Sequence, residues 1–446
     1  MKPLMIVTAP VATRSGYGSH SRDLVRSLIE MDRFDIKINS MKWGNCPMNA
    51  LNERDPNDKV ILDRILTSPN VERQPDVHIQ ISVPNEFTPL AKYNIGITAG
   101  IETTIATPEW VQGMNKMDMN IVPSNFTKET FERTIYEQID ENTKQKAGEL
   151  RLTKPVEVLF EGVDTNVYKK LTKIESEDLK AEFEKIPEKN IFLYTGHWLQ
   201  GNLGNDRKDT GMLIKTFLET FKNYSKPPAL LLKTSGANFS IIDRNDIADK
   251  IASIKDSVKG KLPNIYFLHG DLTDEEMNEM YNHPKIRAHI TFTHGEGFGR
   301  PLLEASLSEK PVVAPNWSGH IDFLTKTNAI LLPGALTDVS PESFPKEMIG
   351  ENAKWFTINY QYASQIMKKL YKSNRKEILN AKKLANYNRG KFSLKAMTSQ
   401  FSKILDNYLP KFEQQPQQVN LNLPKLKKVG ENSEPPKLKL PKLKKV

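Results

Sequence analysis

THGEGFGRPLLEASLSEKPVVAPNWSGHIDFL, residues 293–324, is the stretch of this sequence that decides its fold. The segment RAHITFTH, which runs into it, is apolar and β-branched and predicts a buried strand. The glycines of GEGFG permit backbone angles that other residues avoid, and Pro301 suits the first position of a helix. LLEASLSE then predicts a helix and KPVVAPN the next strand. The whole stretch is a strand–glycine turn–helix–strand unit, which is typical of α/β proteins.

The turn and the two glutamates that flank it predict a ligand. Backbone N–H groups exposed by a glycine turn at a helix N-terminus attract phosphate or another anion. Glu296 and Glu304 lie eight positions apart on either side of the turn. Carboxylates next to an anion accept hydrogen bonds from hydroxyl groups, which sugars and riboses carry in number. The local prediction is a nucleotide with a sugar attached. The alternative is a turn without a ligand, since such turns occur throughout α/β proteins and helix glutamates are usually solvated.

The segment EGFGRPLLE resembles the Glu-x7-Glu signature of GT-B glycosyltransferases, the large group 1 family that uses nucleotide-activated sugars. The resemblance implies that Glu296 contacts the transferred sugar and that Glu304 holds the ribose. It also implies that the turn's N–H groups touch sugar and diphosphate, and that the sugar keeps its anomeric configuration. The donor-binding residues expected in this stretch are His294, Gly297, Phe298, Gly299, Arg300 and Glu304. Residues 98–131 also resemble glycosyltransferases encoded by phages and large DNA viruses.

Twelve short apolar, β-rich runs divide into two series, separated by a charged, linker-like segment at 163–190. The first series is 3–10, 34–41, 77–83, 93–100, 119–124 and 156–162, and the second is 190–196, 229–235, 265–270, 288–294, 311–316 and 329–333. Strands that alternate with helices predict parallel sheets covered on both faces. We therefore expect two doubly wound, Rossmann-like α/β domains of the GT-B type, with the ligand at the carboxyl ends of the strands. The expected domains are 1–168 on the acceptor side and 169–390 on the donor side, followed by a helix at 391–412 and a tail at 413–446. In the family, that helix crosses back to the first domain.

A diphosphate leaving group needs positive charge, because negative charge grows on it as the sugar departs. The segment GHWLQGNLGNDRKDTGMLIKTF resembles the family's diphosphate-binding region, which places Arg207 and Lys208 at the donor and Lys208 among the catalytic residues. The match is imperfect, because the family often has glycine directly after the lysine. An arginine a few residues earlier is also missing, and this chain offers His197 or Asn202 instead. Lys233, in LLLKTSG, is a second candidate.

On the acceptor side, relatives often have a histidine where this chain has TAGIETT. Glu102 is the nearest ionisable group there. Glu102 is therefore a catalytic candidate. Alternatively, it is a structural carboxylate that binds loop N–H groups. Gly16 and Gly18 lie in the turn after the first strand and are placed among the donor-binding residues. Ser124 or Asn125 is expected to cap a helix.

Metal use can be read from the sequence directly. The other major glycosyltransferase fold binds its donor through an Asp-x-Asp motif and a divalent cation, and no two aspartates here stand two positions apart. The histidines show no ligand spacing with cysteine. We therefore expect a site without a metal or other cofactor, with the nucleoside-diphosphate sugar as co-substrate.

The charge of the chain is concentrated at one end. The net charge is +9, and nine lysines and three glutamates from Lys411 onward give that segment +6, so residues 1–410 carry +3. LPKLKKV occurs at 423–429 and again at 440–446, in a Pro- and Lys-rich segment whose composition predicts disorder. The tail at 413–446 is either a solubilising segment or a contact for an anionic partner, a nucleic acid or a membrane surface.

Cys46 is the only cysteine, which fits a reducing compartment, and we expect a cytoplasmic protein without a membrane-spanning helix. The expected function is transfer of a hexose or pentose from a nucleoside-diphosphate sugar to a glycan, protein or small molecule. One alternative acceptor is a hydroxymethylated base in DNA, although the nearly neutral body argues against duplex binding. The alternative from another class is a catalytically inactive GT-B scaffold that docks through its tail.

Overall fold

The computed structural model describes residues 2–412 except 69, 70, 72, 141, 144, 202, 237, 238 and 344–347. Residues Lys2–Phe412 form one compact unit. The predicted domain boundaries at 168/169 and 390/391 fall inside this unit and stay predictions. Asn202 and the tail at 413–446 lie outside the described residues.

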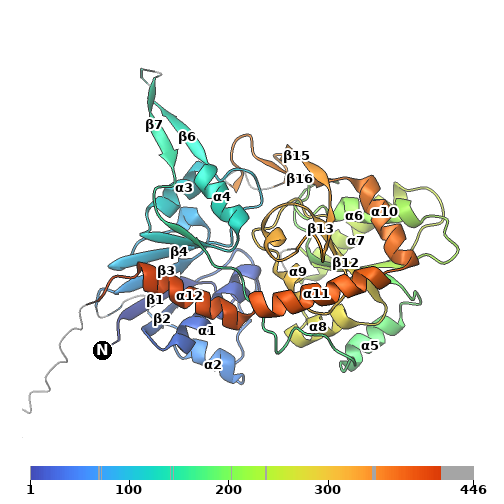
Figure 1. Ribbon diagram of the computed structural model, residues 1–446, viewed down its shortest axis with the longest axis horizontal. Helices are drawn as coiled ribbons and strands as arrows, with labels where there is room; N and C mark the ends of the chain where they lie inside the picture. The colour runs from blue at the N-terminus through green and yellow to red at the C-terminus, as the bar shows by residue number, and fades with distance from the viewer. Residues whose placement is uncertain are drawn as a thin grey trace, which may run out of the picture. The chain divides into compact units, whose positions relative to one another are not determined.

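The first sheet is built from the first series of apolar runs (Figure 1). Its strands pair in parallel in the order β2-β1-β3-β4-β5-β8. The bounds are β1 (Leu4–Ala9), β2 (Asp35–Ser40), β3 (Val77–Ile81), β4 (Tyr93–Ile97), β5 (Met119–Val122) and β8 (Val156–Val158). Strands β1, β3 and β5 are buried along their whole length, because helices cover both faces of a parallel sheet.

The second sheet follows the second series, again with all strands parallel, in the order β11-β10-β9-β12-β13-β14. The bounds are β9 (Ile191–His197), β10 (Ala229–Ser235), β11 (Ile265–Leu268), β12 (Ile286–Ile290), β13 (Val312–Pro315) and β14 (Ile330–Leu332). The predicted doubly wound α/β architecture is confirmed. Strand order reverses between β9 and β12, and ligands in such sheets bind at the carboxyl ends on either side of this reversal. The loops that leave these two strands carry Arg207, Lys208 and Glu296.

The helices are placed between the strands, as the alternating pattern predicts. In the first half they are α1 (Gly16–Met31), α2 (Pro56–Leu62), η1 (Pro84–Glu86), α3 (Pro108–Asn115) and α4 (Asn125–Arg133). In the second they are α5 (Glu177–Glu184), α6 (Thr210–Phe221), α7 (Ile241–Asp256), α8 (Asp274–Asn282), α9 (Arg300–Ser306), η2 (Gly319–Asp322), α10 (Tyr360–Lys372) and α11 (Arg375–Lys391). Ser124 caps α4 by accepting from the Thr127 N–H, as predicted. None of the described helices is long and apolar enough to span a bilayer.

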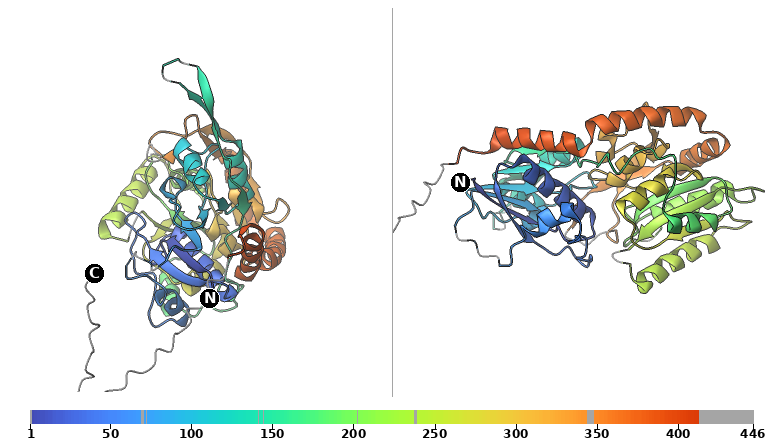
Figure 2. Two further views of the ribbon diagram at one scale, coloured as in Figure 1. Left: turned by 90° about the vertical axis from the view of Figure 1, so that its left-hand side faces the viewer. Right: turned by 90° about the horizontal axis from the view of Figure 1, so that it is seen from below.

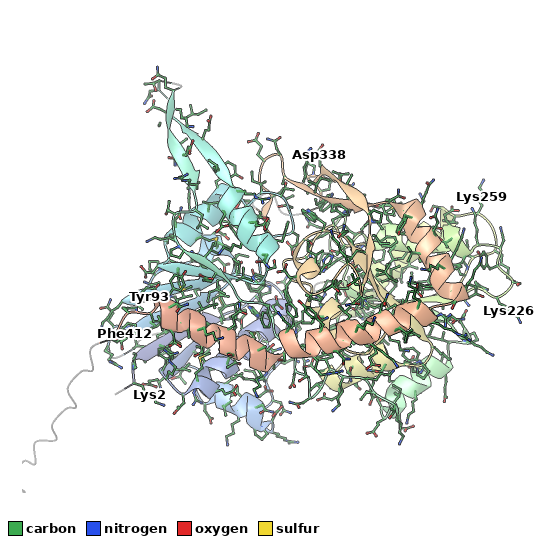
Figure 3. The ribbon with its side chains drawn as sticks, viewed as in Figure 1. Lys2, Tyr93, Lys226, Lys259, Asp338 and Phe412 are labelled. Atoms are coloured by element: carbon green, nitrogen blue, oxygen red, sulfur yellow. The ribbon has the colours of Figure 1, made fainter. Side chains whose placement is uncertain are left out.

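Helix α12 (Leu394–Tyr408) is the last described helix, and it packs on α1 of the first half. It follows α11 directly in the chain, at the red end of the colour bar in Figure 2. Its buried residues Met397, Phe401 and Leu405 recur every four positions, which puts them on one face. The Ser27 and Thr398 hydroxyls lie 2.8 Å apart across the α1–α12 contact. Tyr93 and Phe412, labelled in Figure 3, both pack against the core of the first half.

Two antiparallel hairpins were not predicted from the sequence. The strands are β6 (Ile135–Ile139) with β7 (Lys146–Arg151), and β15 (Gly334–Asp338) with β16 (Lys354–Ile358). Most side chains of β6, β7 and β15 are exposed, so their sequences carry no buried apolar run. Figure 1 shows β6 and β7 as a ribbon that extends beyond α3 and α4.

Candidate functional site

The glycine turn between β12 and α9 leaves backbone donors free. Strand β12 ends at Ile290, earlier than the predicted strand, and residues 291–299 form the loop. Gly299 adopts a left-handed conformation (φ 93°) and caps α9, which begins at Arg300, one residue before Pro301. Within the described part of the chain, the N–H groups of Gly297, Phe298 and Gly299 donate no hydrogen bond. Consecutive free N–H groups are donors of the kind that bind anions.

The same turn lies directly against the first half of the chain. A Cβ on Gly297 would collide with the Ala99 carbonyl, and one on Gly295 with the Glu102 carbonyl. The Ser124 hydroxyl donates to the Gly297 carbonyl at 2.6 Å. Only glycine allows this close approach of two backbones. The turn therefore packs tightly against residues of the first half while it connects β12 to α9 in the second half.

Lys208 and Glu296 form a buried ion pair at this turn. The Lys208 ammonium donates to Glu296 Oε1, and their side chains are only 13% and 11% exposed. Burial pushes the pKa of Glu296 upward, but Lys208 and Arg207 outweigh burial and hold it below its ordinary value. Burial lowers the pKa of Lys208, and Glu296 only partly offsets this. The pair keeps a cation and an acid beside the free N–H groups.

Arg207 connects this pair to the first half. Its Nη1 lies 3.1 Å from Glu102 Oε1 and 3.9 Å from Glu296 Oε2. Burial raises the pKa of Glu102, and the Arg207 charge opposes that rise. Glu102 is an ion-pair partner in this structure, and its carboxylate also accepts from its own backbone N–H in the loop, so the catalytic and the structural interpretation of Glu102 both stay predictions.

The segment that carries Arg207 and Lys208 is held rigidly. Asp206 accepts from the N–H groups of Thr210 and Gly211, and Asp209 accepts from the Tyr360 hydroxyl at 2.6 Å. Asp209 has a left-handed backbone (φ 49°), the conformation that favours glycine. Asp209 follows Lys208 at the position where the resemblance led us to expect glycine, and it adopts a backbone conformation that glycine takes readily.

His294 also contacts the segment that carries Arg207 and Lys208. Its N–H donates to the Arg207 carbonyl, and its ring nitrogens lie 2.8 Å from the Phe356 carbonyl and 3.2 Å from the Gly204 carbonyl. The ring stacks on Trp355 at a centroid distance of 4.0 Å. Both ring nitrogens already face protein carbonyls. His294 thus supports the backbone of the Arg207–Lys208 segment, and its expected contact with the donor stays a prediction.

Glu304 is paired with Arg300 one turn earlier on α9. Arg300 Nε donates to Glu304 Oε1 at 2.9 Å, and Arg300 Nη1 donates to Asp23 Oδ2 on α1. Burial raises the pKa of Glu304 to about 7, with Arg300 opposing the rise. Burial also raises the pKa of Glu161, in the segment after β8, to about 7. A group of buried acids therefore surrounds Arg300.

A cavity of about 570 Å³ opens beside the ion pairs. Glu102, Arg207 and Lys208 line one part of it together with His197. The remaining lining residues are Trp198, Leu199, Gln200, Gly236, Asp243, Asp246, Ile247, Lys250, Ser343 and Met348. The cavity is large enough for part of a nucleotide sugar or its acceptor.

The other predicted residues make the following contacts. Lys233 Nζ donates to the Gly270 carbonyl at 2.7 Å, and its charge acts on His197, which lines the cavity. The Phe298 ring packs on Phe323 in the core, so only its backbone faces the turn. Gly18 uses its N–H in capping α1 through Ser15, while a Cβ on Gly16 would meet nothing within 4 Å. Among the described residues, no group of three or more His, Cys, Asp or Glu side chains is arranged to hold a metal ion.

The sequence did not single out Asp23 or Glu161. Asp23 sits in the SRDLVRSL helix, and its partner Arg300 is 277 positions away. Asp23 is 6% and Glu161 8% exposed, although charged residues are rarely this buried without a function or a partner. Neither carries a local motif that would have drawn attention to it.

Known structures share this architecture. The chain is similar to sucrose-phosphate synthase from Thermosynechococcus elongatus, with 12% identity, a TM-score of 0.60, and coverage of 91% of this chain and 99% of that one. It is similar to a glycosyltransferase from Rickettsia africae, with 14% identity, a TM-score of 0.58, and coverage of 92% and 100%. It is also similar to HepE from Anabaena in complex with UDP-glucose, with 14% identity, a TM-score of 0.56, and coverage of 91% and 100%.

The chain has the GT-B fold. No protein-family model and no curated protein matches it. Similarity at this level of identity establishes the fold alone, because one fold hosts many activities.

Proposed function

We propose that this GT-B protein is a glycosyltransferase that moves a sugar from a nucleoside-diphosphate sugar to an acceptor. One observation carries the proposal: Arg207 and Lys208 are held at a turn with three free N–H groups, and each contacts Glu296. Two cations and an N–H cluster suit a diphosphate, and a carboxylate beside them suits a sugar hydroxyl. HepE, a structure of the same fold, is described in complex with UDP-glucose, which supports this class of donor.

In this proposal the residues divide the work between the leaving group and the sugar. The Lys208 ammonium, the Arg207 guanidinium and the N–H groups of the turn stabilise the negative charge that develops on the diphosphate. Glu296 accepts hydrogen bonds from the transferred sugar, and Glu304 from the ribose. Because Lys208 and Glu296 neutralise each other without a ligand, donor binding redistributes their contacts: the ammonium turns to phosphate and the carboxylate to hydroxyl groups.

The proposed reaction retains the configuration of the sugar, as the resemblance of EGFGRPLLE to its family implies. It also proceeds without a divalent cation. The chain lacks the Asp-x-Asp motif, and the positive charge that a metal would bring to a diphosphate is supplied by Arg207 and Lys208.

The test is incubation of the full chain with a panel of nucleotide sugars, with and without candidate acceptors. Release of nucleoside diphosphate and the thermal shift caused by each compound are measured. The proposal predicts that at least one donor raises the melting temperature and releases its nucleoside diphosphate, and that Lys208→Met abolishes the release. Stabilisation by a nucleotide sugar with no release under any condition would instead support the inactive scaffold.

A further inference from the structure

Arg300, the first residue of α9, forms an ion pair with Asp23 on α1. Its side chain is 15% exposed, and its guanidinium is shared between two carboxylates of different halves. Nε donates to Glu304 Oε1 at 2.9 Å, and Nη1 donates to Asp23 Oδ2. The side chains of Glu304 and Asp23 are only 9% and 7% exposed. One planar group thus bridges the proposed ribose ligand and the first helix of the chain.

Arg300 is surrounded by buried carboxylates, whose negative charge it offsets. The carboxylates of Asp23, Glu161 and Glu304 all interact with Arg300, and burial opposes the ionised form of both glutamates. Arg26 Nη1 lies 3.7 Å from Asp23 Oδ1, and the Arg22 charge also acts on Asp23. His20, on α1, is buried beside Arg300, and burial with the Arg300 charge lowers its pKa to about 3, so it adds no positive charge. Arg300 is thus the main charge that keeps Glu304 available as a carboxylate.

We propose that Arg300 is a positioning residue that orients Glu304 for the ribose and couples nucleotide binding to helix α1 through Asp23. This inference rests on the proposed function, since it takes Glu304 as the ribose ligand. Asp23 then influences donor affinity without contacting the donor. The nucleotide is bound fully only when α1 and α9 are in contact.

The chemistry of the side chains makes the proposal specific. A guanidinium is a planar fork that can donate to two carboxylates from fixed directions, whereas a lysine ammonium is a compact charge on a flexible stem. Arg300→Lys therefore keeps the charge and loses the geometry. Asp23→Asn keeps the shape and loses the charge-assisted hydrogen bond.

The experiment is calorimetric titration of the nucleoside diphosphate that binds the wild-type full chain. The variants are Arg300→Lys, Arg300→Leu, Asp23→Asn and Asp23→Asn with Arg300→Leu. Asp76→Asn is the matched control, because Asp76 is also a buried first-half acid, held by Lys92 at 2.8 Å and by the Leu4 N–H. Melting temperatures report the structural effect of each change. Steady-state kinetics with the nucleotide sugar as the varied substrate give kcat and KM for each variant.

We expect Asp23→Asn and Arg300→Lys each to weaken nucleotide binding by about tenfold, as for one lost charge-assisted hydrogen bond. Their effect should fall on KM for the donor more than on kcat, because the ribose is remote from the breaking bond. Asp23→Asn should not weaken nucleotide binding further when it is combined with Arg300→Leu. Asp76→Asn should lower the melting temperature and leave affinity unchanged.

The outcomes separate the two proposals. If no nucleoside diphosphate binds the wild type, the proposed function fails and this inference with it. If the wild type binds and turns over, but Asp23→Asn and Arg300→Lys bind as tightly as the wild type, only the inference is overturned. Equal losses for Asp23→Asn and Asp76→Asn would also overturn it, by reducing Asp23 to a stabilising role. If Arg300→Leu does not fold, Arg300→Lys and Asp23→Asn decide.

Discussion

Arg207 Nη1 lies 3.1 Å from Glu102 Oε1, so a cation from the second half of the chain is paired with an acid from the first. The contact adds to the close approach of the β12–α9 turn to residues 99–102. Sequence-distant residues thus meet at the carboxyl ends of two separate parallel sheets, which is where doubly wound sheets bind ligands. The charges at this meeting point give rise to the predictions that follow.

Lys208→Met should reduce sugar transfer by about a hundredfold or more, the range seen when a group that stabilises developing negative charge is removed. The matched comparison is Lys233→Met, because Lys233 donates to the Gly270 carbonyl and does not contact Glu296. It should retain most of its turnover. Initial rates of nucleoside diphosphate release decide between them, and a larger loss for Lys233→Met would show that the diphosphate lies nearer β10.

Nucleotide affinity should rise with pH through the ionisation of Glu304. The charged groups that act on this carboxylate include Arg300, Asp274, Asp23 and Glu161, the Tyr168 and Tyr281 hydroxyls also interact with it, and burial places its pKa at about 7. If the ionised form binds the ribose hydroxyls, affinity grows about tenfold from about pH 6 to 8, because the ionised fraction grows by that factor. Glu304→Gln should flatten the profile in calorimetric titrations. An unchanged profile in that variant would assign the titration to another group.

The stability of the free protein should move in the opposite direction. The folded pKa of Glu304 lies above that of an unfolded glutamate, so the folded state holds the proton more tightly. Its stabilising contribution is complete at acidic pH and is lost as pH rises toward about 7. Denaturant titrations should therefore show that Glu304→Gln gains stability relative to the wild type as pH rises from about 5 to 8. A relative loss over that range would contradict the assignment of the raised pKa.

Sugar transfer should survive excess EDTA, because Arg207 and Lys208 supply the positive charge that a cation would bring to the diphosphate. Added Mg²⁺ should produce no more than a modest change, through release of the product. The measurement is turnover before and after chelation. Abolition by EDTA with recovery on adding Mn²⁺ would mean that the donor site has been assigned wrongly.

The tail at 413–446 should serve attachment and not catalysis. A chain that ends at Phe412 keeps all of α12 and loses eight of the nine terminal lysines. We expect the same turnover on a small acceptor and no salt-sensitive retention on DNA or anionic lipid, since screened contacts fade within about 8 Å at physiological ionic strength. Loss of turnover at an unchanged melting temperature would place the tail in the active site.

The sequence predicted the strands well because a buried parallel strand needs a continuous apolar run, and twelve such runs are present. It predicted the Lys208–Glu296 neighbourhood because both residues lie in segments that resemble a family. The Arg300–Asp23 bridge was not predictable, since its partners are 277 positions apart and neither has a distinctive local context. The bond from the His294 N–H to the Arg207 carbonyl was not predictable either, because no local pattern beside a glycine turn indicates a partner 87 positions away.

The central claim is that Glu304 holds the ribose and Glu296 the transferred sugar. Its most direct test is calorimetric titration of a nucleoside diphosphate, chosen from the panel, into the wild type, Glu304→Ala and Glu296→Ala. We predict that Glu304→Ala weakens binding by about 1–3 kcal/mol, as expected for a lost buried hydrogen-bond partner. Glu296→Ala should bind the diphosphate as the wild type does while its turnover falls. Equal nucleoside diphosphate affinity in the wild type and Glu304→Ala would contradict the account.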